Sequence, residues 1–336
     1  MKVNIKDIAE ATGLSITTVS RVINNKAAQY RISEDTQKNI KEAAEKLNYV
    51  PNQFAANLKS GKSKTIALIL PVLNNPFFAA IASEINLQLY KHGFMTILTD
   101  CDENPDIEDE ILSKIQSYNI EGLLIAPSGE KYEKVERLHQ GGLPVVCIDR
   151  YFEGLDMPYV ATDNYTGAYS ATEELIKRGH INIACIQGNR KSSPNQQRVK
   201  GYSDALKNAS IAQSTILGDA FSMENGYIET MMLLKSKNIP TAIFTLSNTI
   251  AFGCMKALKE ENIRIPEDIS LITYDDSPYF DFLKTSLTSI KQPLIEISRI
   301  AVKILMAKIN GEELQSTQIF LNPQMIVRDS IMSLSK

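Results

Sequence analysis

Residues 5–25, with the sequence IKDIAEATGLSITTVSRVINN, constrain the fold of this chain more than any other stretch. Asn4 is a favoured cap for a first helix, and Gly13 can end that helix because glycine adopts the left-handed conformation at little cost. Ser15 can then cap a second helix. Apolar residues recur at helical spacing in both segments, so each helix has one face to bury. The stretch therefore predicts two short helices joined by a tight turn.

A third helix is predicted after this pair, and the second helix is predicted to keep a polar outer face. Ser33 can cap the third helix, and two acidic residues follow it in the first turn, where they favour a helix. In the second helix Val19 and Val22 point inward, whereas Arg21 points outward. Three short helices within residues 1–50, the second one polar outside, are typical of a helix-turn-helix that reads the DNA major groove. The alternative is a helical oligomerisation module, but the turn glycine, the caps and the outward arginine favour DNA binding.

Charge is divided unevenly along the chain. Residues 1–62 contain ten lysines and arginines against six acidic residues, whereas the remainder contains 26 against 33. A basic head on an acidic body fits a protein whose contacts with DNA phosphates are confined to one end. The acidity of the whole chain argues against general coating of nucleic acid.

Length and composition set further limits. At 336 residues the chain is long enough for more than one domain, and no apolar run reaches the roughly 20 residues that a membrane-spanning helix needs. The N-terminus shows no apolar signal segment. The four cysteines, at positions 101, 147, 185 and 254, have neither metal-site nor disulfide spacing. We therefore expect a cytoplasmic protein with no membrane association, no metal and no cofactor.

Residues 51–61, PNQFAANLKSG, join the predicted head to the rest of the chain. Pro51 ends the third helix and can begin another, but the segment is too short for a stable isolated helix in water. It can fold on DNA, with Leu58 as a candidate wedge in the minor groove. The alternative is a plain linker whose Leu58 packs on the body. Residues 61–63 resemble the end of a phosphate-binding loop, but position 56 is alanine and no strand precedes it, so a nucleotide site is not predicted.

From residue 65 onward, short apolar runs alternate with amphipathic helical stretches. This alternation predicts parallel sheets covered by helices on both faces. About 270 residues are more than one such sheet needs, so two lobes are expected. The predicted strands are 65–71, 94–100, 122–127, 144–149, 159–163, 181–187, 240–246 and 269–274, and the predicted helices include 77–92, 106–118, 164–178, 198–208, 225–235 and 249–260.

Polar and aromatic side chains gather where the predicted strands end, which is where open α/β sheets bind ligands. Carboxylates and amides can accept hydrogen bonds from neighbouring hydroxyls, arginine donates in a fork, and aromatic faces stack on the C–H side of a sugar. The pattern favours a carbohydrate, with a purine as the alternative, since aromatic stacking and an arginine could hold a base too. The segments concerned are 74–78, 149–150, 187–198, 247–248 and 274–276.

These features resemble the LacI/GalR family of bacterial transcriptional regulators over essentially the whole chain. The resemblance implies an all-α helix-turn-helix head at 1–50, a hinge helix at 51–62, and an α/β body at 63–336. The body should resemble a periplasmic sugar-binding protein with two doubly wound, mostly parallel sheets, its N-lobe at 63–161 and 292–319 and its C-lobe at 162–291 and 320–332. The family resemblance rests on these motifs: residues 5–25, LNYVPNQFAANLKSGKSKTIAL at 47–68, NNPFF at 74–78, RVKGYSDAL at 198–206, and LITYDD and LTSIKQP within 271–293.

The resemblance also implies a function and a set of site residues. It implies a repressor that binds a pseudopalindromic operator in double-stranded DNA as a homodimer, with a tetramer left open, and a small effector, favoured as a sugar, that controls operator affinity. The expected DNA contacts are Ile16, Thr17, Thr18, Ser20, Arg21, Asn24 and Leu58. The expected effector contacts are Phe77, Phe78, Asp149, Arg150, Asn195, Arg198, Phe221, Asn248, Asp275 and Gln292.

The chain departs from the usual family pattern at three places. Thr249 stands where an aspartate usually follows Asn248, Thr273 stands where a glycine is usual, and the loop 24–36 is longer than usual. The first two departures bear on how the lobes close and on which effector they hold. Whether the effector is an inducer or a corepressor, such as a purine, stays open at this point.

Two other classes of protein are disfavoured. An enzyme would need more than Asp149 and the Asp275–Asp276 pair, since no nucleophile–base pair, metal cluster or glycine-rich phosphate loop accompanies these acids. A solute-binding protein of transport would not need a DNA-binding head.

Overall fold

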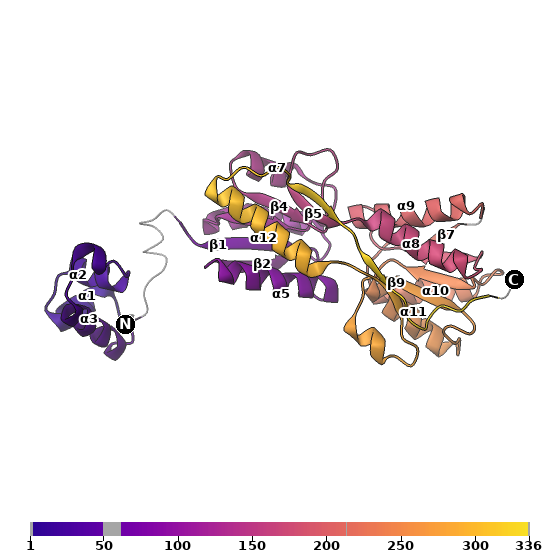
Figure 1. Cartoon of the computed structure of the whole chain (residues 1–336), viewed down its shortest axis with the longest axis horizontal. Helices are drawn as coiled ribbons and strands as arrows, with labels where there is room; N and C mark the ends of the chain where they lie inside the picture. The colour runs from indigo at the N-terminus through magenta and orange to yellow at the C-terminus, as the bar shows by residue number, and fades with distance from the viewer. Residues whose placement is uncertain (1–2, 50–61, 213, 335–336) are drawn as a thin grey trace. The chain divides into compact units, whose positions relative to one another are not determined.

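The structure is a computed structural model that describes residues 3–49, 62–212 and 214–334. Contacts divide the chain into two units, Met1–Ser63 and Lys64–Lys336, which we call the head and the body and describe separately (Figure 1). The predicted hinge helix and the Leu58 wedge lie outside the described residues.

The described part of the head contains three α-helices, as predicted: α1 (Ile5–Thr12), α2 (Ile16–Ile23) and α3 (Glu34–Lys46). Asn4 and Asp7 form a capping box, in which the Asn4 backbone N–H donates to the Asp7 carboxylate at 2.7 Å. Gly13 ends α1 in the left-handed conformation with φ 68°, and Ser15 and Ser33 cap the next two helices. The buried core of the head consists of Ile8, Ala9, Val19, Val22, Ala27, Ile40 and Ala44.

The N-lobe of the body is built on a six-stranded parallel sheet in the order β11-β5-β4-β3-β1-β2. Helices α5 and α12 pack in one hydrophobic cluster with this sheet, while α6 and α7 contribute to a second cluster. The elements are β1 (Thr65–Leu70), α5 (Pro76–Lys91), β2 (Met95–Asp100), α6 (Pro105–Ile115), η2 (Gln116–Tyr118), β3 (Gly122–Ile125), α7 (Glu133–Gln140), β4 (Val145–Ile148), β5 (Tyr159–Thr162), α12 (Leu294–Asn310) and β11 (Gln318–Leu321).

The C-lobe is built on a second six-stranded sheet in the order β12-β10-β9-β8-β6-β7, parallel except for the β10–β12 pair. Helices α8 and α9 share one hydrophobic cluster with this sheet, and α10 and α11 share another. The elements are α8 (Asn164–Lys177), β6 (Ile183–Ile186), α9 (Ser193–Asn208), β7 (Thr215–Leu217), α10 (Met223–Leu234), β8 (Ala242–Thr245), α11 (Asn248–Glu260), β9 (Ser270–Tyr274), η3 (Pro278–Phe282), β10 (Thr288–Lys291) and β12 (Gln324–Ile326).

The chain passes from one lobe to the other three times: between β5 and α8, between β10 and α12, and between β11 and β12 (Figure 1). The parallel strands of each lobe are followed by loops at their carboxyl ends, and these loops carry the side chains that the sequence analysis singled out. The predicted fold class is therefore confirmed.

The structure differs from the predicted elements in several places. The short strands β7, β10, β11 and β12 and the helices α7 and α12 were not among them, and α9 begins at Ser193 rather than at residue 198. Pro194 in the first turn explains the earlier start of α9, because proline is well tolerated there. All four cysteines are free and buried in the structure. None of the described helices is both long and apolar enough to cross a membrane.

Candidate functional site

A closely packed cavity lies between the two lobes of the body, at the carboxyl ends of strands from both sheets. Every residue that lines it except Phe221 is buried. Eight of the ten predicted effector residues line this cavity: Phe77, Phe78, Asp149, Arg150, Arg198, Phe221, Asp275 and Gln292. Asn75, Pro194 and Ser247, which the sequence analysis did not name as contacts, line it as well.

Arg198 on α9 is held by contacts with several elements of the C-lobe. Its Nε donates to Asn164 Oδ1 at 2.8 Å, and one terminal nitrogen donates to the Leu246 carbonyl at 2.7 Å. The other terminal nitrogen lies 3.7 Å from a carboxylate oxygen of Asp275, and the guanidinium carbon lies 3.7 Å from the centre of the Tyr274 ring. These contacts compensate the buried charge and fix its position.

Asp275 is joined to the segment that connects β10 to α12. The Gln292 side-chain amide donates to Asp275 Oδ1 at 2.6 Å, and the Thr162 hydroxyl donates to the Gln292 carbonyl oxygen at 2.5 Å. Burial raises the pKa of Asp275, and the nearby Arg198 and Gln292 oppose that shift. Gln292 therefore links the cavity to two of the three connections between the lobes.

Asp149 carries a polar atom without a partner. Its Oδ1 is buried and accepts no hydrogen bond from the described residues. Arg150 Nε is buried as well and donates no hydrogen bond to them. Burial raises the pKa of Asp149 to about 6, although Arg198 and Arg150 pull it down. Asp149 and Asp275 also both adopt the left-handed conformation, with φ 60° and 67°. Unsatisfied buried polar atoms and unusual backbone at the ends of two strands are typical of a ligand site.

Glu103 compensates the charge of Arg150. The two terminal nitrogens of Arg150 donate to the two carboxylate oxygens of Glu103 at 2.8 and 2.6 Å, and one also donates to the Pro127 carbonyl. Asn189, which belongs to the C-lobe, donates to the same carboxylate at 3.3 Å. Sequence reasoning missed Glu103 because its partners are far away in the chain.

Two predicted effector residues do not line the cavity. Asn195 is turned toward its own loop, where its carbonyl oxygen accepts from Gly188 N at 2.8 Å and its amide donates to Gln187. Asn248 is the first residue of α11 and follows the cavity-lining Ser247; its Oδ1 is buried without a partner in the described chain. Asn195 therefore holds the loop after β6 in place.

Two of the lining residues that were not named as contacts, Asn75 and Ser247, share a local signal. Asn75 caps α5 by accepting from Phe77 N at 2.9 Å, and Ser247 caps α11 by accepting from Ile250 N at 3.2 Å. A capping residue in the loop between a strand and the next helix lies near the carboxyl edge of the sheet, so the pattern could have identified both.

Thr249 and Thr273, the two departures from the family pattern, both support cavity walls. The Thr249 hydroxyl donates to the Phe221 carbonyl at 3.2 Å, and the Thr273 hydroxyl donates to the Ser247 carbonyl at 3.0 Å. Each threonine thus fixes the backbone of a lining residue and presents no charge to the cavity.

Each arginine of the cavity lies close to at least one carboxylate. Asp149 and Asp275 face Arg150 and Arg198, and Glu103 adds a further carboxylate on Arg150. No uncompensated cation is therefore left to attract an anionic ligand. The arrangement suits a neutral ligand whose hydroxyl groups donate to carboxylate oxygens.

In the head, the outer face of α2 presents a mixture of exposed and half-buried side chains. Ile16, Thr17 and Asn24 are exposed, and the Asn24 amide donates to the Ser20 carbonyl at 2.7 Å. The Thr18 hydroxyl lies 2.8 Å from that of the capping Ser15, so it is engaged at the start of the helix.

Arg21 is held by an aromatic side chain from the long loop that follows α2. Its guanidinium carbon lies 3.7 Å from the centre of the Tyr30 ring, and Tyr30 ends the short 3-10 helix η1 (Ala28–Tyr30). Ala27, at the start of this turn, is buried in the core of the head. The loop is therefore anchored, and it restricts the guanidinium of Arg21.

Two family descriptions match the chain. Residues 4–52 match "Bacterial regulatory proteins, lacI family", and residues 63–323 match "Periplasmic binding proteins and sugar binding domain of LacI family". The two matches together cover both the head and the body.

Three similar proteins match the chain over nearly its whole length. The HTH-type transcriptional regulator DegA of Bacillus subtilis (strain 168) is 31% identical over 340 residues, which cover 100% of each chain. The ribose operon repressor of Haemophilus influenzae is 32% identical over 332 residues, 98% of this chain and 99% of that one. The transcriptional repressor PurR of Haemophilus influenzae (strain PittEE) is 31% identical over 336 residues, with the same coverage.

A solved structure resembles the body. The crystal structure of a LacI family transcriptional regulator from Enterococcus faecium with bound ribose matches with a TM-score of 0.74 and 31% sequence identity. The match covers 81% of this chain and 100% of that one.

Proposed function

The chain belongs to the LacI family of bacterial regulatory proteins, and from this premise we propose that it is a repressor whose operator affinity is set by a neutral sugar. It is a DNA-binding transcriptional regulator with a ligand-binding body, and it is not an enzyme. Operator binding would take place where the chromosome lies, in the cytoplasm.

The proposal of a sugar rests on the unpartnered Asp149 carboxylate oxygen, in a cavity where both arginines are already paired with carboxylates. A hydroxyl group of a sugar can donate to this oxygen, and a second one can accept from Arg150 Nε. A phosphate or carboxylate ligand would bring a negative charge that no free cation compensates. The ribose in the similar structure and the similar ribose operon repressor support a pentose as the first candidate.

A purine is the second candidate ligand. It rests on the similarity to PurR repressors and on the half-buried ring of Phe221 at the cavity wall. Phe77 and Phe78 are less available than Phe221 for stacking on a purine. Both belong to the hydrophobic core of the N-lobe and pack edge to face against each other, with ring centroids 5.1 Å apart.

We propose that the ligand acts by changing the angle between the lobes. Since nearly all lining side chains are buried, a ligand reaches the cavity only when the lobes separate, and it then favours the arrangement that closes around it. The change would pass to the heads through residues 51–62, where Leu58 would contact the minor groove. By thermodynamic linkage, the operator must change ligand affinity by the same factor as the ligand changes operator affinity.

The proposed ligand can be tested by calorimetry and thermal unfolding with D-ribose, ribose 5-phosphate and hypoxanthine. We expect D-ribose to stabilise the protein by about 2.7 kcal/mol at 100 times its Kd, and ribose 5-phosphate to bind far more weakly. Asp275→Asn should weaken ribose binding by about 10- to 100-fold, because a charged hydrogen bond is lost while asparagine keeps the left-handed backbone.

The exposed Asp102→Asn, also at a left-handed position, is the matched control and should bind ribose normally. If hypoxanthine stabilises the protein and no sugar does, the ligand is a purine and not a sugar. A sugar that binds tightly yet leaves operator affinity unchanged would contradict the switch.

Ligand affinity should depend on pH through Asp149. Since the carboxylate form accepts hydrogen bonds from hydroxyls and its pKa is about 6 in the free cavity, affinity should fall about tenfold from pH 7 to pH 5. The stability of the free protein should move the other way, because a raised pKa stabilises the folded state as pH falls through about 6.

Calorimetry in buffers of different ionisation enthalpy would measure the proton released on binding near pH 6. Asp149→Asn should abolish this release even where residual binding is measurable. An affinity that stays flat between pH 7 and pH 5 would show that Asp149 does not contact the ligand.

We propose that two copies of the chain associate through the β2 edge of the N-lobe. Strand β2 is the last in its sheet, and its Met95 and Leu98 side chains are 72% and 43% exposed. On the preceding helix α5, Leu87 and Tyr90 are exposed too. An unpaired apolar edge of this kind favours pairing with a second chain.

The double substitution Met95→Lys and Leu98→Lys should yield a monomer in sedimentation equilibrium, because four lysines would face one another across the two-fold interface. Sugar affinity should persist, while affinity for a two-half-site operator should fall steeply. Val327→Lys, at another exposed apolar position, is the control and should stay dimeric. A dimer that survives the double substitution would place the interface elsewhere.

Arg21 is proposed to read a base edge, with Tyr30 holding its guanidinium. The operator for this test is selected from random DNA by the unmodified protein. Arg21→Ala should weaken the free energy of operator binding by about 1–3 kcal/mol and relax the base preference at one base pair per half-site. Tyr30→Leu should weaken binding less while leaving the preferred base unchanged.

Fluorescence anisotropy at fixed salt would measure both effects. Lys38→Ala, on the exposed surface of α3, is the control and should leave base preference unaltered. If Arg21→Ala weakens all operator sequences equally, Arg21 contacts only phosphate.

A further inference from the structure

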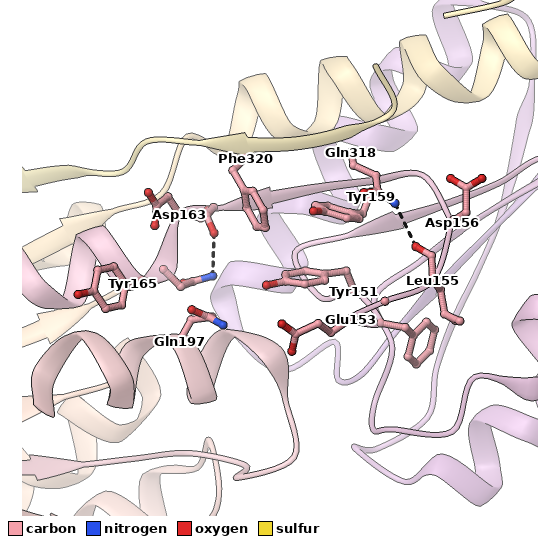
Figure 2. Close-up of a pocket in the computed structure, with 14 residues that line it drawn as sticks. Tyr151, Glu153, Leu155, Asp156, Tyr159, Asp163, Tyr165, Gln197, Gln318 and Phe320 are labelled. Atoms are coloured by element: carbon pink, nitrogen blue, oxygen red, sulfur yellow. Dashed lines mark hydrogen bonds between the residues drawn. The ribbon is translucent and has the colours of Figure 1, made fainter. Parts of the chain in front are cut away.

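A second hollow, of about 650 Å³, lies at the junction of the two lobes (Figure 2). Its lining shares no described residue with the ligand cavity. The loop after β4, the strand β11 and the N-terminal part of α8 contribute to its walls, together with Gln197 of α9. We call it the junction hollow.

Half-exposed aromatic rings form one wall of the junction hollow. Tyr151 and Tyr159 stack with centroids 4.6 Å apart and an interplanar angle of 19°. Phe320 packs against both, with centroids 5.4 Å from Tyr151 and 5.2 Å from Tyr159, and is itself 49% exposed. Tyr165 of the C-lobe lines the opposite side (Figure 2). Aromatic surface gathered in a hollow and left open to solvent is typical of a binding site.

The charged residues that line the junction hollow are all acidic: Glu153, Asp156 and Asp163. Glu153 and Asp156 are exposed and form no ion pair within the described part of the chain. Asp163 caps α8 by accepting from Thr166 N at 3.0 Å. The hollow therefore presents carboxylates beside aromatic rings, with no lysine, arginine or histidine in its described lining.

The pKa of Tyr151 agrees with a negative potential in the hollow. Burial raises the pKa of the Tyr151 hydroxyl to about 12, and Tyr159, Glu153 and Asp163 add to this shift. The ammonium group of Lys200 lies 5.7 Å from the Tyr165 ring centre, outside the lining. Tyr165, on the opposite side of the hollow, thus already attracts a cation to its ring.

We propose that the junction hollow binds a small organic cation with an apolar group, such as an aromatic primary amine. The apolar group of this ligand would pack on Tyr151 and Phe320, while its ammonium group would lie near Glu153 and over an aromatic face. In Figure 2, Glu153 and Gln197 point into the same space beside Tyr151, and the Gln197 carbonyl can accept a further hydrogen bond.

Binding there would also act on the regulator, a consequence that rests on the proposed function. Tyr151, Tyr159 and Phe320 belong to the N-lobe side, whereas Tyr165 and Gln197 belong to the C-lobe. A cation that contacts both sides favours one angle between the lobes and would therefore change sugar affinity. The binding itself does not require a sugar in the cavity.

The test compares three probes that share a phenyl group and differ in their polar group: phenethylamine, phenethyl alcohol and phenylacetate. Each is titrated into the full-length protein, and binding is followed by ligand-observed NMR. We expect phenethylamine to bind about five- to tenfold more tightly than the alcohol, and phenylacetate not to bind. Equal binding of the amine and the alcohol, or preferred binding of phenylacetate, would overturn the proposal.

Variants locate the site. Glu153→Gln should weaken phenethylamine binding about five- to tenfold and leave the alcohol unaffected, whereas Phe320→Ala should weaken both. Asp102→Asn, an exposed acid elsewhere on the N-lobe, is the control and should change neither. Thermal unfolding of each variant would verify folding. Amine binding that persists unaltered in both Glu153→Gln and Phe320→Ala would place the cation site outside the junction hollow.

Discussion

The buried guanidinium of Arg198 is the contact on which the arrangement of the C-lobe side of the ligand cavity depends. Asn164 begins α8, Leu246 follows β8 and Asp275 follows β9, so one side chain ties three elements together. Removing such a charge from water costs several kcal/mol unless its hydrogen bonds are replaced. Here two direct hydrogen bonds, a carboxylate and the Tyr274 ring replace them, and the cavity inherits a fixed geometry.

The sequence predicted the parts of the fold whose causes are local. The caps Asn4 and Ser15 and the turn at Gly13 define the head through contacts within a few residues. The central strands were also predictable, because residues buried on both faces read as continuous apolar runs. Strands such as β11, whose residues alternate between exposed and half-buried at the edge of a sheet, carry a weaker signal.

The candidate site was predictable only in part, for a similar reason. The rule that ligands bind beyond the carboxyl ends of parallel strands identified the segments that contain Asp149, Arg198 and Asp275, and the family resemblance selected these residues within them. It could not show that Asn195 turns toward its own loop, since the direction of a side chain depends on which partner folding brings near. Glu103 pairs with residues 47 and 86 positions away, so nothing beside it in the sequence indicates its role.

The energies involved are sufficient for a ligand to change the angle between the lobes. Hydrogen bonds that join the lobes directly include Asn189 to Glu103 and Tyr151 N to the Ser193 hydroxyl, each worth about 0.5–1.5 kcal/mol net, or somewhat more where a carboxylate takes part. Water can replace such bonds when the lobes separate. Shifting a two-state equilibrium from 1:99 to 99:1 takes about 5.5 kcal/mol of differential binding. Two or three hydrogen bonds to buried charged groups, at about 1.5–3 kcal/mol each, supply that amount if they form only in the closed arrangement. The unpartnered oxygen of Asp149 and Nε of Arg150 provide two of them.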